Sequence, residues 1–281
     1  MKRFMEKAGI SLALVTLFAA SLFGQKMTAE QIIAKHLDSI GTAEARGAIK
    51  DMVARGSVVY TALRAGGAGG DGAFVIASEG NKSLLGMTFR TPDYPGETFI
   101  FDGQKTKVAF AVSNSRSYLG DYLFRYDNII KEGLLGGTLI HGWRLHNATG
   151  TNARVKADGK KKIEGRETLV LDYNPRKGSD VSIKIYIDAE TFRHVRTEYN
   201  ARIPAPQGPT VDSSSQQREV RQTLVEDFGD FKEEKGLTLP HSYKMYLRME
   251  DARGVREYEF KSTFSEFFFN QGLDPNSFSV N

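Results

Sequence analysis

The stretch 181–199 reads V-S-I-K-I-Y-I-D-A-E-T-F-R-H-V-R-T-E-Y, and it decides the fold class. Aliphatic residues occupy every second position from Val181 to Ile187, and the positions between them are mostly polar. This alternation predicts an extended strand with one apolar face and one solvated face. Residues 188–191 have the composition of a turn, so a second strand is predicted to return beside the first. The apolar face of this hairpin must be covered by a core, a partner or a bound molecule.

The same period of two recurs along most of the chain. In the returning strand of the first hairpin, Tyr199 is predicted on one side and His194 on the other. Turn residues separate the runs, and Asp102-Gly103 and Asp158-Gly159 are typical of tight hairpins. Because short turns join antiparallel neighbours, the runs predict an antiparallel sheet. Strand-like runs are predicted at about 53–64, 72–79, 82–90, 97–102, 105–112, 152–157, 161–173, 181–188, 192–202, 217–231, 238–250 and 254–268.

Helical spacing is confined to two parts of the chain. Thr28 and Gln31 have the spacing of a capping box, and apolar residues then recur at helical intervals up to Ile40, which predicts a helix. A short second helix is predicted over about 43–50. Residues 117–146 break the strand pattern and predict one or two short helices, loosened by glycines around Trp143, the only tryptophan.

The first 24 residues have the form of a secretory signal peptide. A basic start is followed by an uncharged run over residues 8–23, and about 16 residues is short for a spanning helix, which needs roughly 17–25. The alternative is an uncleaved anchor. The chain has no cysteine, which excludes a disulfide framework and a lipid anchor on a mature N-terminal cysteine. Export without cysteine favours the bacterial periplasm.

The charge balance argues against a nucleic-acid-binding protein. Removal of the predicted leader takes away three basic residues and one acidic residue, which lowers the formal charge from +4 to about +2. Residues 25–281 are long enough for one large β domain, in which the proline- and serine-rich segment 203–216 is predicted to be a flexible loop.

The number of strands predicts the overall shape. A twisted sheet of about eleven strands curls rather than staying flat. The fold class is therefore mainly β with a few helices: an incomplete, half-open antiparallel barrel with a helical lid or plug. Such a wall encloses more space than its own side chains easily fill, and the predicted helices are too few to seal it. An apolar cavity, and with it an apolar ligand, is the expected consequence.

Several segments together resemble the periplasmic lipoprotein-carrier superfamily (LolA/LolB-like, outer membrane lipoprotein-sorting proteins). They are the helix at 29–40, the hairpin E-T-F-I-F-D-G-Q-K-T-K-V-A-F, the hairpin I-Y-I-D-A-E-T-F-R-H-V-R-T-E-Y, the segment G-L-T-L-P-H-S-Y and the tail N-x-G-L-D-P-x-x-F. The resemblance implies a half-open barrel with a helical lid over a hydrophobic cavity. It also implies a carrier that takes lipid or the acyl chains of lipoproteins across the periplasm to the outer membrane, with envelope membrane proteins as further partners.

A carrier of this kind needs an apolar lining, a movable lid and polar groups at the mouth. Ordinary core packing and solvated surface charge remain alternatives for each residue. The predicted lining is Phe99, Phe101, Phe110, Ile183, Ile185, Met245 and Leu247. The predicted lid is Leu123, Phe124 and Trp143, and the predicted headgroup or partner contacts are Arg116, Arg125 and Arg144.

Catalytic and metal chemistry find little support in the sequence. His141 and His146 are five residues apart with no tight set of further ligands around them, so neither a metal nor another cofactor is expected. The chain lacks the H-E-x-x-H motif, a nucleophile elbow and cysteine, which favours a protein that is not an enzyme. A triad that includes His141 or His194 remains open, because the order of triad residues in a chain is free. The main alternative to a carrier is an envelope scaffold subunit with a filled core.

Overall fold

The computed structural model describes residues 26–64, 68–110, 117–147, 153–175, 180–205 and 219–280. The predicted signal peptide, Arg116 and most of the predicted loop 203–216 lie outside these residues. Within them, no helix is both long enough and apolar enough to cross a membrane.

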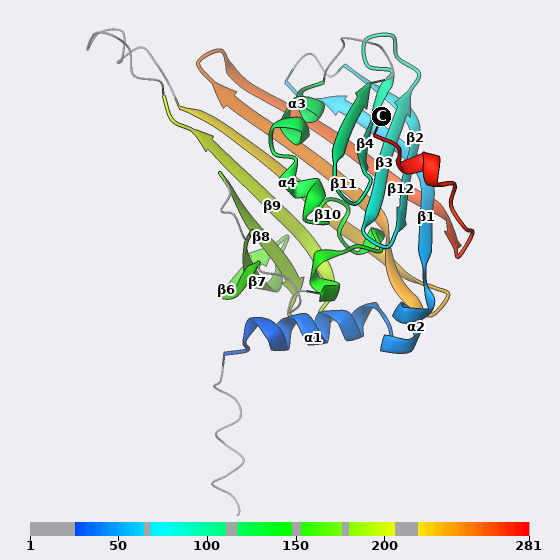
Figure 1. The fold of residues 1–281 in the computed structure, drawn as a ribbon. Coiled ribbons are helices and arrows are strands. Elements are labelled where there is room, and N and C mark those ends of the chain that lie inside the picture. The colour runs from blue at the N-terminus through cyan, green and yellow to red at the C-terminus, as the bar shows by residue number, and fades with distance from the viewer. Residues whose placement is uncertain are drawn as a thin grey trace, which may run out of the picture.

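Twelve strands form one antiparallel sheet that is not closed (Figure 1). The order across the sheet is β5-β4-β3-β2-β1-β12-β11-β10-β9-β8-β7-β6, so only the β1–β12 pair joins strands that are distant in sequence. The strands are β1 (Asp51–Ala62), β2 (Gly69–Glu79), β3 (Lys82–Phe89), β4 (Gly96–Phe101), β5 (Thr106–Phe110), β6 (Arg154–Ile163), β7 (Arg166–Asn174), β8 (Val181–Asp188), β9 (His194–Ile203), β10 (Val220–Glu234), β11 (Leu237–Asp251) and β12 (Gly254–Phe269). The predicted mainly-β, half-open antiparallel fold is confirmed.

The helices are few and short. They are α1 (Ala29–Ile40), α2 (Ala43–Ala48), α3 (Tyr118–Arg125), α4 (Asn128–Lys131) and the 3-10 turns η2 (Gly137–Leu139), η3 (Arg144–Asn147) and η4 (Pro275–Phe278). The predicted capping box begins α1: the Thr28 hydroxyl accepts from the Gln31 amide, and the Gln31 side chain accepts from the Thr28 amide. Figure 1 shows α1 across one end of the sheet and α3 and α4 in front of the long strands.

One turn was predicted in the wrong place. Asp158-Gly159 lies inside β6, where the pairing with β7 shifts between Ala157 and Lys160, and Gly159 has a left-handed φ of 82°. These are the features of a β-bulge built on glycine. The chain reverses at Glu164-Gly165, where both residues have positive φ, as a two-residue hairpin turn requires.

A second bulge changes the side on which His194 lies. Tyr186 pairs with Arg196 and Ile187 with His194, so Val195 is the extra residue of β9. One extra residue in a strand reverses the side on which the side chains beyond it point. His194 was predicted on the other side of β9 from Tyr199, but it lies on the same, fully buried side. The predicted apolar face of β8 is confirmed: Val181, Ile183, Ile185 and Ile187 are all buried in the core.

Candidate functional site

A segment of short helical turns, residues 117–147, occupies the inside of the curled sheet, and we call it the plug. It comprises α3, α4, η2 and η3, which contact strands from different parts of the sheet: α3 contacts β5, α4 contacts β4 and η2 contacts β11. Its large apolar side chains are buried in the same core as those of the strands. They are Leu119, Tyr122, Leu123, Tyr126, Ile129, Ile130, Leu134, Leu135, Leu139, Ile140, Trp143 and Leu145.

The sequence predicted a continuous apolar cavity beneath this segment, because few helical turns were expected to bridge a wide opening. Instead, the plug passes through that space and fills much of it with its own side chains. Glycines permit this course: Gly136 and Gly137 have positive φ, and a Cβ on Gly137 would lie 2.7 Å from the Nδ1 atom of His194. The backbone therefore approaches the strands more closely than other residues would allow.

A buried carboxylate fastens the middle of the plug to the sheet. Glu226 on β10 is fully buried and accepts hydrogen bonds from the Gly136 amide at 2.7 Å, the Tyr243 hydroxyl at 2.5 Å and the Tyr199 hydroxyl at 2.6 Å. Burial raises the pKa of Glu226 from 4.5 to about 7, although all three donors favour the ionised form. Protonation or ionisation of Glu226 would therefore alter its hydrogen bond to Gly136 and with it the attachment of the plug.

A second buried carboxylate holds the start of the plug. Glu97 on β4 accepts from the Ser117 hydroxyl at 2.6 Å and from the Tyr94 hydroxyl at 2.5 Å. The same Ser117 oxygen caps α3 by accepting from the Gly120 amide at 2.8 Å. Burial raises the pKa of Glu97 to about 7, against the lowering effect of its two hydroxyl donors.

The end of the plug is held by a stack of rings. Trp143 is 1% exposed, stacks on His194 with 4.8 Å between the ring centroids, and donates from Nε1 to Nε2 of His36 at 3.0 Å. The other nitrogen of His36 lies 3.0 Å from the carbonyl oxygen of Phe192, to which it can donate. Burial lowers the pKa of His36 to about 4, so this ring is neutral near pH 7. The stack joins the plug, α1 and β9.

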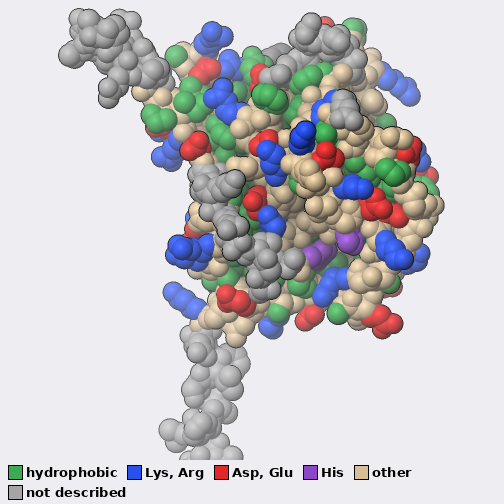
Figure 2. Space-filling model, in the orientation of Figure 1, with side chains coloured by type: hydrophobic (Ala, Val, Ile, Leu, Met, Phe, Trp, Pro, Cys, Tyr) green, Lys and Arg blue, Asp and Glu red, His purple; other side chains and the backbone are tan. Residues whose placement is uncertain are grey.

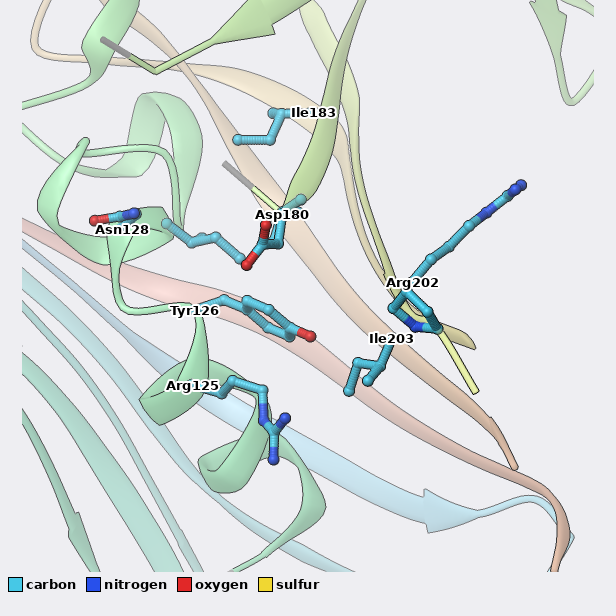
Figure 3. Close-up of a pocket in the computed structure, with 10 residues that line it drawn as sticks. Arg125, Tyr126, Asn128, Asp180, Ile183, Arg202 and Ile203 are labelled. Carbon is cyan, nitrogen blue, oxygen red and sulfur yellow. The ribbon is translucent and has the colours of Figure 1, made fainter. Parts of the chain in front are cut away.

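A groove remains open where the plug meets β8 and β9 (Figure 3). Its volume is about 380 Å³, which is within the range of roughly 300–1,000 Å³ typical of ligand pockets. Its lining mixes apolar side chains with polar and charged ones. The lining residues are Arg125, Tyr126, Asn128, Ile129, Asp180, Val181, Ile183, Arg202, Ile203 and Pro204.

The predicted lining residues lie mainly in the core rather than on this groove. Phe99, Phe101, Ile185, Met245 and Leu247 are buried in it, with exposures between 0% and 7%. Ile183 is buried and also lines the groove. Phe110 is half-buried at the end of the edge strand β5. Their role as cavity lining stays a prediction.

The predicted lid residues differ from one another in their surroundings. Leu123 and Trp143 are buried inside the plug, whereas Phe124 is 58% exposed on the outer side of α3. Of the predicted headgroup contacts, Arg125 lines the groove, and Arg144 forms an ion pair with Glu132 inside the plug. Arg116 lies outside the described residues.

Neither buried glutamate is among the residues predicted from the sequence, although the pattern of their strands marks both. Glu226 alternates with Leu224 and Phe228, and Glu97 shares its side of β4 with Phe99. An acidic residue at an inward-facing strand position is unusual enough to mark a candidate site.

The histidines mostly contact the backbone. The two ring nitrogens of His141 lie 3.2 Å and 2.9 Å from the carbonyl oxygens of Gly80 and Ile49. Nε2 of His194 lies 2.8 Å from the Thr197 hydroxyl and 3.1 Å from the carbonyl oxygen of Arg196. Within the described parts of the chain, no group of three or more histidine, aspartate or glutamate residues is placed to hold a metal ion.

Three solved bacterial structures are similar to this chain. A protein domain from Vibrio parahaemolyticus, described as an outer membrane lipoprotein-sorting domain, is 15% identical with a TM-score of 0.48, over 88% of this chain and 95% of that one. A DUF1329 family protein from Desulfovibrio piger is 13% identical with a TM-score of 0.44, over 89% and 96%. A LolA superfamily protein from Nitrosomonas europaea is 15% identical with a TM-score of 0.44, over 90% and 98%.

Two of the three are described as an outer membrane lipoprotein-sorting domain and a LolA superfamily protein, the superfamily that the sequence resembles. No family model matches the chain. No curated protein matches it either.

Proposed function

We propose that this protein binds an amphiphilic lipid in the groove between the plug and strands β8 and β9. The proposal rests on a groove of about 380 Å³ whose lining mixes apolar side chains with polar and charged ones, as an amphiphile requires. Ile129, Ile183 and Ile203 would contact the acyl chain, and Arg125 the headgroup. The function is reversible binding without covalent chemistry.

The strength of such binding suits a carrier. Burying apolar surface contributes roughly 25 cal/mol per Å², so an acyl chain that covers the half-buried Ile203 and buries its own surface against the groove binds reversibly. The cargo would be a lipid or the acyl chain of a lipoprotein, carried toward the outer membrane. The predicted leader at 1–24 and the absence of cysteine support a periplasmic location, with residues 25–281 as a single domain.

A second candidate is an envelope scaffold subunit, and the packing of the plug favours it. The plug side chains share one core with the strands, so much of the interior is occupied by the protein itself. A scaffold would use its outer surface, where Leu63 and Tyr118 are large and exposed. A protein that binds no amphiphile but purifies with an envelope partner would favour the scaffold.

A charge placed in the groove should block binding of a fluorescent fatty acid. Ile203 is half-buried on the groove wall, and Ile203→Glu would set a carboxylate against the acyl chain. We expect affinity for dansyl-undecanoic acid to fall about tenfold or more, since losing one apolar contact costs at least 1.4 kcal/mol. Fluorescence titration measures this change.

The matched control places the same charge far from the groove. Val59 on β1 is 44% exposed, and Val59→Glu should leave the affinity within about twofold of the wild type. Equal losses in both variants, or no saturable binding by the wild type, would rule out the groove as the binding site.

A further inference from the structure

The groove carries two opposite charges on facing elements. Arg125 ends α3 and Asp180 directly precedes β8, and the ring of Tyr126 lies between them in Figure 3. Both charges act on the Tyr126 hydroxyl: burial raises its pKa, Arg125 opposes this rise and Asp180 adds to it. Both charged groups therefore line the groove together with this phenol.

Neither charge is paired with another described residue. Ion pairs are common elsewhere: Arg196 pairs with Asp227 at 2.5 Å, and Lys244 pairs with the same carboxylate at 2.8 Å. No ion pair or side-chain hydrogen bond joins Arg125 or Asp180 to any part of the chain that the structure describes, and the two do not pair with each other. Both residues are exposed to solvent, so a ligand in the groove that supplies a partner for each gains two charge-assisted contacts in place of water.

The third charged residue of the lining, Arg202, does not place a further charge inside the groove. Arg202 precedes Ile203 on β9, and its side chain extends away from the groove in Figure 3. The Tyr126 hydroxyl donates to Oε1 of Gln222 at 3.2 Å, which leaves its oxygen free to accept a further hydrogen bond. The groove thus offers one cation, one anion and one neutral acceptor.

We propose, on the basis of the binding function above, that the groove selects amphiphiles whose headgroup carries both a phosphate and a primary ammonium group. The guanidinium of Arg125 binds the phosphate, for which its planar donors are well suited. The carboxylate of Asp180 accepts from the ammonium group, and the Tyr126 oxygen accepts a second hydrogen bond. Phosphatidylethanolamine has this headgroup, whereas phosphatidylglycerol has the phosphate alone.

Short-chain phospholipids that dissolve as monomers allow a direct test by isothermal titration calorimetry. We expect the wild type to bind diheptanoyl phosphatidylethanolamine about tenfold more tightly than diheptanoyl phosphatidylglycerol, the value of one charge-assisted hydrogen bond. Asp180→Asn should weaken binding of the ethanolamine lipid about tenfold and leave the glycerol lipid unchanged or tighter. Arg125→Gln should weaken both lipids alike, because both have the phosphate.

Two exposed residues in the β3–β4 connection provide matched controls. Arg90→Gln and Asp93→Asn make the same chemical changes outside the groove, and both should leave the affinities within about twofold. Equal wild-type affinity for the two lipids, with no selective loss in Asp180→Asn, would overturn the headgroup assignment and leave lipid binding intact. A wild type that binds neither lipid would overturn the binding function and the selectivity with it.

Discussion

Replacing Trp143 with alanine should lower the free energy of unfolding by about 3–5 kcal/mol, the usual cost of removing a large buried aromatic side chain. The indole is 1% exposed, stacks on His194 and donates to His36, so the variant leaves both a void and an unpaired nitrogen. Trp143 is the only tryptophan, so the variant has no tryptophan fluorescence with which to follow unfolding. Unfolding in urea should therefore be followed by far-ultraviolet circular dichroism.

Phe124→Ala is the control for this experiment. It removes an aromatic ring from the same segment, but that ring is 58% exposed, so stability should change by no more than about 0.5 kcal/mol. A loose lid would give small losses in both variants. A small loss in Trp143→Ala would therefore contradict the assignment of residues 117–147 as a plug that is part of the core.

The second large effect concerns pH. Because the pKa of Glu226 is raised from 4.5 to about 7, the folded protein binds more protons than the unfolded chain between these values. Stability from this group is therefore present below pH 4.5 and is lost as the pH rises to about 7. Glu226→Gln keeps a neutral side chain at every pH. Relative to the wild type, the variant should gain roughly 3 kcal/mol between pH 4.5 and 7.5, at 1.36 kcal/mol per pKa unit.

Comparison of variant and wild type isolates Glu226 from its titratable neighbours. Asp227, Tyr199 and Tyr243, which act on Glu226 in the wild type, are present in both proteins. Burial lowers the pKa of His36 and of His194, which makes stability rise with pH below about 6.5 in both. Chemical denaturation at a series of pH values gives the difference. A matched change at an exposed site, Glu233→Gln on β10, should alter stability by no more than about 0.5 kcal/mol.

If the difference for Glu226→Gln is constant with pH, this carboxylate titrates normally in the folded protein. The buried attachment at Gly136 would then not depend on its charge state. Such a result would remove Glu226 as a pH-sensitive contact of the plug.

The sheet was predictable because the alternation of apolar and polar residues can be recognised within each strand by itself. The alternation from Val181 to Ile187 places four side chains in the core without knowledge of any other strand. His194 was placed on the wrong side because a bulge is decided by pairing between strands, which a single strand does not reveal. The turn at Glu164-Gly165 was missed for a related reason, since Asp158-Gly159 is the stronger local signal.

The candidate site depends on contacts that the local pattern cannot give. Arg125 and Asp180 are far apart in sequence and belong to elements with different periods, so only the tertiary structure brings them to one groove. The interior was expected to be hollow because helical residues were counted as a cover. In the structure the side chains of residues 117–147 pack in the interior, because the positive φ of Gly136 and Gly137 lets the chain run inside the curled sheet.

The most direct test of the account is to locate the acyl chain. A phosphatidylethanolamine with a photoreactive diazirine in its acyl chain should be bound, irradiated and mapped by peptide mass spectrometry. We expect crosslinks at Tyr126, Ile129, Ile183 and Ile203, which line the groove. Crosslinks confined to exposed positions such as Val59 and Leu63, or none that excess unlabelled lipid removes, would contradict it.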